Sequence, residues 1–81
     1  MTLDNLMKTR HVTGVKQVTK AVQKGTAKCV FLASDADQSV TALLKEACEA
    51  KKIEVVNDVT MRELGKACSI EVGASAAAVL M

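Results

Sequence analysis

The fold of this chain is decided by the stretch GVKQVTKAVQK, residues 14–24. On a helical wheel, at about 100° per residue, the three valines of the stretch fall on one side. The other side carries its polar side chains, Lys16, Gln17, Lys20 and Lys24. The apolar side requires a core, whereas the polar side gathers ammonium groups beside a helix start at Gly14. Helix N-termini favour anions, so the stretch predicts a helix that meets nucleic-acid phosphates and base edges. A solvated lysine face on an ordinary surface helix remains the alternative.

The composition is typical of one small folded domain, and we expect residues 1–81 to form it. The chain has 81 residues, of which 49% are hydrophobic and 25% are charged. Phe31 is its one aromatic residue. Proteins that stack single-stranded bases on aromatic side chains need several of them, so this class is excluded.

The charges are divided unevenly along the chain. Residues 1–30 carry six cationic side chains against one carboxylate, whereas residues 31–81 carry five against eight. The net charge is only +2. A basic lobe on a near-neutral protein indicates a local patch for a polyanion.

The cysteines argue against metal binding and secretion. Cys29, Cys48 and Cys68 lie in apolar runs and form no C-x-x-C pair, so we expect buried free thiols, no metal site and no cofactor. Free thiols fit a reducing cytoplasm. No apolar run has the length of a signal peptide or a membrane span, so we expect a cytoplasmic protein that does not enter a membrane.

Periodicity and turn residues predict alternating helices and strands. We expect one or two helical turns with Leu3, Leu6 and Met7 facing inward, then a brief edge strand. The remaining expected elements are buried strands over 27–33, 53–56 and 74–81, and helices over 14–24, 38–51 and 61–68. In the helix over 38–51, the apolar positions are Val40, Leu43, Leu44, Ala47 and Cys48. Alternating helices and buried strands favour an α/β fold, a three-layer α-β-α sandwich with a small mixed β-sheet.

The start of the helix over 61–68 has the clearest local signal. Thr60 and Glu63 have the spacing of a capping box, in which each side chain accepts a hydrogen bond from the backbone of the other. Val59 and Leu64 are spaced as a hydrophobic staple. A helix beginning at Met61 is therefore predicted, with a loop at 57–59 before it.

Two motifs resemble those of the kink-turn RNA-binding ribosomal proteins, the L7Ae-like family. GVKQVTKAV, residues 14–22, resembles the family signature Gly-x-Asn-Glu-x-Thr-Lys-x-x. DVTMRELGKACSIEV, residues 58–72, is similar to the family's loop and the Leu-Gly-x-Ala-x-Gly-Ile-x-Val that follows it. The resemblance covers essentially the whole chain and is strongest to the short bacterial members of the YbxF type.

The resemblance implies a protein that binds a kink-turn, a sharply bent RNA duplex with tandem sheared G·A pairs beside a three-nucleotide bulge. Gly14 would let the helix N-terminus approach the RNA backbone. Lys16 and Gln17 occupy the Asn and Glu positions that read guanine edges, and Lys20 occupies the motif lysine that contacts a guanine or phosphates. Val59, Thr60 and Met61 fall in the loop that packs on the extruded bulge nucleotide, and Arg62 follows them.

Physical chemistry supports the same residues. A bent RNA brings phosphates close together, and Arg10, Lys16, Lys20 and Arg62 could relieve that repulsion. Apolar Val59 and Met61 could cover an unstacked base. The expected partner is structured RNA, with ribosomal RNA as the family-based candidate, bound by a monomer. A protein-interaction module on the same fold remains the alternative. An enzyme is the third class, without a recognisable catalytic set, since the one histidine, His11, lacks a partner for catalysis.

Overall fold

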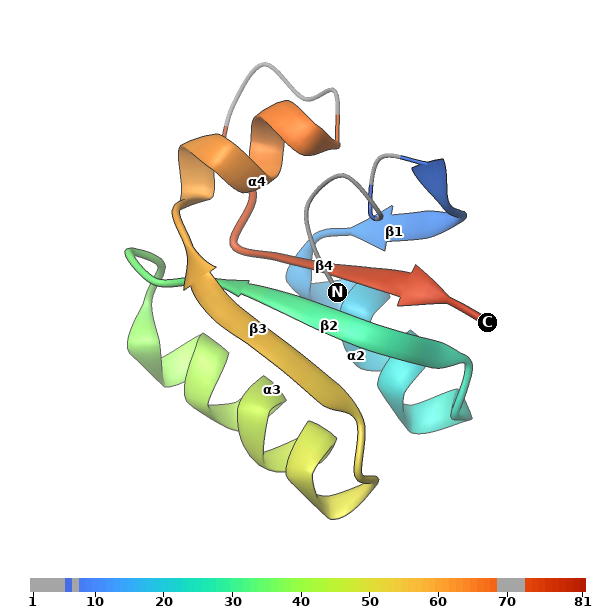
Figure 1. Cartoon of the computed structure of the whole chain (residues 1–81). Helices are drawn as coiled ribbons and strands as arrows, with labels where there is room; N and C mark the ends of the chain where they lie inside the picture. The colour runs from blue at the N-terminus through green and yellow to red at the C-terminus, as the bar shows by residue number, and fades with distance from the viewer. Residues whose placement is uncertain (1–5, 7, 69–72) are drawn as a thin grey trace.

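The computed structural model describes residues 6, 8–68 and 73–81. Within these residues, four strands alternate with three helices in the order expected from the sequence (Figure 1). The elements are β1 (His11–Thr13), α2 (Val15–Lys24), β2 (Ala27–Ala33), α3 (Gln38–Ala50), β3 (Glu54–Val59), α4 (Met61–Ala67) and β4 (Ala76–Leu80).

The strands form one mixed sheet in the order β1-β4-β2-β3. The last strand of the chain, β4, lies between β1 and β2 and is antiparallel to both, while β2 and β3 are parallel. Ala78 is paired with Val12 on one side and with Val30 on the other. The parallel pair requires a crossover, and α3 supplies it.

Helices cover both faces of this sheet, which confirms the three-layer α-β-α sandwich (Figure 1). On one face, α2 and α3 bury Val18, Val22 and Leu44 against the β2 residues that point the same way. On the other face, α4 packs with Leu6 against a cluster that contains Phe31, and both side chains are fully buried. The strand β2 is therefore buried on both faces, as its apolar sequence predicted.

Three of the helix ends have a local cause in the sequence. Gly25 ends α2 in the left-handed conformation, with φ 73°, and its N–H bonds back to the last turn. The Asp37 carboxylate caps α3 by accepting from the Ser39 N–H at 3.0 Å. The predicted capping box of Thr60 and Glu63 is present at the start of α4.

Several details differ from the expectation. The last strand covers Ala76–Leu80 rather than 74–81, and Cys68 is only partly buried. The strand expected over 53–56 is β3, which starts one residue later and continues to Val59, so residues 57–59 are not a loop. It is only partly buried, because it forms an edge of the sheet and α3 covers one face of it. Leu43 of α3 is 69% exposed rather than buried. Leu6 is buried as expected, while Leu3, Met7 and the connector over 69–72 lie outside the described residues.

Candidate nucleic-acid interface

The two helix starts singled out in the sequence lie at the same end of the sheet. The Gly14 N–H donates to the Ala76 carbonyl at 2.9 Å, and the Ala74 N–H donates to the Met61 carbonyl at 3.1 Å. The short segment 74–76 that leads into β4 is thus bonded to the start of α2 and to the start of α4. Figure 1 shows α4 beginning beside the point where β4 enters the sheet. Junctions 47 residues apart in the sequence therefore border one surface.

The N-terminus of α2 is open. Gly14 provides the N-cap position with φ 93° and ψ 147°, a conformation accessible almost only to glycine. Among the residues that the structure describes, no side chain caps this end, and the first turn contains no acidic residue. The first N–H groups of a helix have no partner within the helix, so those of the first turn of α2 remain available to an external acceptor.

The polar face of α2 is exposed beside this open end. Lys16, Gln17 and Lys20 are all exposed, whereas Thr19 turns inward and donates to the Val15 carbonyl at 2.7 Å. Over residues 6, 8–68 and 73–81, neither lysine forms an ion pair. Two free ammonium groups and one amide can thus approach the same ligand as the first-turn N–H groups.

The start of α4 differs, because its N–H groups are already bonded. The Thr60 hydroxyl accepts from the Glu63 N–H at 3.1 Å, and the Glu63 carboxylate accepts from the Thr60 N–H at 3.0 Å. The Met61 N–H donates to Oδ1 of Asp35 at 2.7 Å, across 26 residues. Two carboxylates therefore close this end, and it is not a second anion site.

The side chains expected in the loop before α4 are not equally accessible. Val59 was expected in this loop, but it ends β3, so the loop assignment is wrong for this residue. Its side chain is 7% exposed and lies in the core cluster with Leu64, the residue with which a hydrophobic staple was predicted. Thr60 is partly buried and engaged in its capping box, and Met61 is partly buried against the core. Arg62 is exposed. Met61 and Arg62 are thus the side chains of this group best able to meet a ligand.

Arg10 lies away from the other predicted residues. Its carbonyl accepts from the Leu80 N–H at 2.9 Å, at the far end of β4 from Ala76. Four residues of extended chain, about 13 Å, separate Arg10 from Gly14. The structure therefore groups Lys16, Gln17 and Lys20 around Gly14 and leaves Arg10 at the opposite end of β1.

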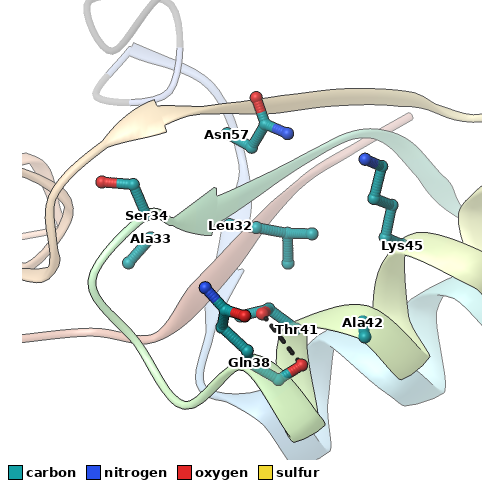
Figure 2. Close-up of a pocket in the computed structure, with 8 residues that line it drawn as sticks. All are labelled: Leu32, Ala33, Ser34, Gln38, Thr41, Ala42, Lys45 and Asn57. Carbon is teal, nitrogen blue, oxygen red and sulfur yellow. Dashed lines mark hydrogen bonds between the residues drawn. The ribbon is translucent and has the colours of Figure 1, made fainter.

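A groove with a volume of about 330 Å³ lies between α3 and the ends of β2 and β3 (Figure 2). Leu32 forms its floor, and Gln38 and Asn57 supply amide groups from its two sides, as Figure 2 shows. The other lining residues are Ala33, Ser34, Thr41, Ala42 and Lys45. The sequence did not predict this groove, because three separate segments form it and none carries a recognisable motif.

The described residues offer no activated nucleophile. Burial, with a hydrogen bond to Glu54, raises the pKa of Cys29 to about 11, so its thiol stays protonated near neutral pH. Burial also raises the pKa of Cys48. The His11 ring makes one hydrogen bond among the described residues, between Nδ1 and the Thr9 carbonyl at 2.9 Å. In the part of the chain that the structure describes, no three His, Cys, Asp or Glu side chains gather as a metal ligand set. No helix in that part has the length and apolar character needed to cross a membrane.

A family model, related sequences and a solved structure all match this chain. The family model described as Ribosomal protein L7Ae/L30e/S12e/Gadd45 family matches residues 2–81. A Caldanaerobacter subterraneus subsp. tengcongensis protein, named an RNA-binding protein, is 46% identical over 69 residues, which are 85% of this chain and 84% of that relative. RNA-binding protein YbxF of Geobacillus stearothermophilus is 39% identical over the same shares of the two chains. The solved structure of the Giardia lamblia 15.5kD RNA binding protein has a TM-score of 0.82 at 30% identity, covering 88% of this chain and 60% of that one.

Proposed function

Since this chain belongs to the ribosomal protein L7Ae/L30e/S12e/Gadd45 family, we propose that it is a non-catalytic RNA-binding protein that recognises a kink-turn in structured RNA. The observation that carries this proposal is the open N-terminus of α2, where Gly14 leaves free N–H groups beside exposed Lys16, Gln17 and Lys20. Relatives that share most of the chain are named RNA-binding proteins, which supports the same partner.

In this proposal the start of α2 recognises the G·A pairs. The Gln17 amide both donates and accepts hydrogen bonds, so it can pair with the edge of a base. Lys16 and Lys20 are pure donors, and they approach guanine acceptors or the phosphates that the bend brings together. The first-turn N–H groups and the helix dipole add to the attraction for the RNA backbone.

The start of α4 meets the extruded bulge nucleotide. Met61 offers a partly exposed apolar side chain, which can cover an unstacked base without an aromatic ring. Arg62 is exposed one residue further on and can reach a phosphate. Val59 is buried and supports this surface from the core rather than contacting RNA.

The proposal also covers the domain organisation, the RNA partner, the oligomeric state and the cellular compartment. Residues 1–81 act as one RNA-binding domain, and the partner is a structured RNA such as ribosomal RNA. The protein is a cytoplasmic monomer that requires no cofactor. Its three free cysteines fit a reducing compartment.

The test compares two RNAs that differ only in the G·A pairs. Affinity is measured by calorimetry for a kink-turn RNA and for a matched RNA whose G·A pairs are Watson–Crick pairs. The kink-turn should bind about tenfold tighter or more, since one specific base contact is worth about 1–3 kcal/mol. Equal binding of the two RNAs, or no binding, would instead favour a protein-interaction module on this fold.

A pair of lysine variants on α2 locates the contact. Lys20→Ala should weaken kink-turn binding by about tenfold, the loss of one charge-assisted hydrogen bond. Lys24→Ala is the matched control, because Lys24 lies on the last turn, about 6 Å further from Gly14 along the helix axis. Equal losses from the two variants would place the RNA elsewhere on the basic lobe.

A further inference from the structure

We propose that Asp35 is a positioning residue for RNA recognition, which holds the start of α4 so that Met61 faces the extruded nucleotide. Asp35 lies in the turn between β2 and α3, outside both motifs that indicated RNA binding. This inference rests on the proposed function. It adds Asp35, which affects RNA binding through its contact with Met61.

The contact that carries the proposal joins two segments distant in sequence. Oδ1 of Asp35 accepts from the Met61 N–H at 2.7 Å. Met61 is the first residue of α4, so its N–H has no acceptor within the helix and would otherwise face solvent. A hydrogen bond to a carboxylate is stronger than one between neutral groups, so this contact fixes the backbone at Met61.

A second segment holds Met61 from the opposite side. The Met61 carbonyl accepts from the Ala74 N–H at 3.1 Å. A Cβ added at Gly73 would lie 3.0 Å from the Met61 Cβ and 3.2 Å from its carbonyl oxygen, so the chain passes Met61 at close range. Both polar groups of the Met61 backbone are thus bonded to other parts of the fold, which sets the direction of its side chain.

Because Asp35 is negatively charged, the direction of the change in RNA affinity on its removal tests the proposal. Asp35 is exposed and lies at the end of the molecule that is proposed to meet a polyanion. If its only effect were electrostatic, removing the carboxylate would strengthen RNA binding. If Asp35 positions Met61, removing it weakens binding even though repulsion is reduced.

The experiment uses the full chain, a kink-turn RNA and the same RNA with an abasic site at the extruded nucleotide. Asp35→Ala should bind the intact RNA about tenfold more weakly than the wild type, the factor expected when one charged hydrogen bond is lost. On the abasic RNA the two proteins should bind within about twofold of each other, because the base that Met61 covers is absent. Asp35→Asn keeps an oxygen acceptor and should restore binding of the intact RNA.

Two further variants distinguish a positioning role of Asp35 from an effect of its charge on RNA binding and from a failure of the variant to fold. Asp58→Ala removes a nearby exposed carboxylate from β3 without removing the Met61 contact, and it should bind as well as the wild type or tighter. Gly73→Ala leaves Asp35 intact but forces Met61 to shift, and it should reproduce the loss on the intact RNA alone. If Asp35→Ala does not fold, as judged by circular dichroism, Gly73→Ala alone decides the outcome.

The results that overturn the proposal are distinct from those that overturn the proposed function. Intact-RNA binding by folded Asp35→Ala that equals or exceeds that of the wild type rejects the positioning role. So do equal losses on intact and abasic RNA, for either Asp35→Ala or Gly73→Ala. A wild-type protein that does not distinguish a kink-turn from its Watson–Crick counterpart rejects the function itself.

Discussion

At the scale of single residues, a substitution at Gln17 can separate the effect of charge on RNA binding from the effect of hydrogen bonding. It is exposed in the first turn of α2, and that turn holds no acidic residue. Gln17→Glu introduces a carboxylate, a stronger acceptor for guanine N–H groups than an amide. We expect the ratio of affinities for kink-turn and Watson–Crick RNAs to rise in the variant, as measured by calorimetry with both RNAs.

The stability of the variant is measured alongside, because a carboxylate near a helix N-terminus also stabilises the helix by about 0.3–1 kcal/mol. A higher melting temperature with an unchanged affinity ratio would remove Gln17 from the recognition of guanine. A general fall in affinity for both RNAs would show only added repulsion from phosphates.

Local pairs of residues were predictable from the sequence, and distant pairs were not. The Thr60 and Glu63 capping box follows from a spacing of three residues, and both of its hydrogen bonds are present. Asp35 and Met61 are 26 residues apart, and only the packing of the loops brings them together. Asp35 lies between the strand expected over 27–33 and the helix expected over 38–51, and the sequence carried no signal for its partner.

At the scale of elements, α2 depends on the two glycines at its ends. Gly14 has φ 93° and Gly25 has φ 73°, and a Cβ at either position would meet nothing within 4 Å. Both are therefore constrained by backbone conformation and not by space. We expect Gly14→Ala to lower the free energy of unfolding by about 1–3 kcal/mol, measured by urea denaturation, because its conformation is accessible almost only to glycine.

Gly25→Ala is the matched control for that change. Its left-handed conformation costs a side chain about 1 kcal/mol, so this variant should also be destabilised. Only Gly14→Ala should weaken RNA binding under conditions where both variants are folded, since Gly25 lies at the other end of α2. Similar losses of affinity in both would mean that the open end of α2 is not the contact.

The sequence pattern predicted every helix and strand that the structure describes, but it did not predict which side chains at their margins are buried. It placed Leu43 on the buried face of α3, but the structure leaves this side chain exposed, because Leu43 lies about 100° around the helix from the buried Leu44. It ended the third strand before Val59 because Asn57 and Asp58 are typical of loops. An edge strand tolerates such residues on its exposed positions, and only the sheet order reveals which strand is the edge.

At the scale of the whole molecule, the candidate interface exists because the last strand enters the middle of the sheet. Ala74, just before β4, and Ala76, its first residue, are bonded to the two helix starts, so the strand order β1-β4-β2-β3 brings these starts to one end of the sheet. The alternation of helices and strands predicted the layers. It did not determine the strand order, because several orders satisfy the same periodicity.

This arrangement gathers few cations, which predicts a modest dependence on salt. Lys16, Lys20 and Arg62 are the exposed cations that the proposed function places against the RNA. Three phosphate contacts correspond to a slope of about −2 to −3 in a plot of log K against log salt. Calorimetry between low and physiological salt should give this slope, and Lys20→Ala should reduce it by about one. A slope above about six would require phosphate contacts over much of the basic lobe.

The central strand β4 also constrains how the protein can change over time. Ala76, Ala77 and Ala78 are fully buried, and they face alternate helix layers. A larger side chain at any of them would push a layer outward, at about 1–3 kcal/mol each. Substitutions are therefore more costly at the centre of the sheet than at its exposed rim, so the ligand-facing surface can change without a change of scaffold.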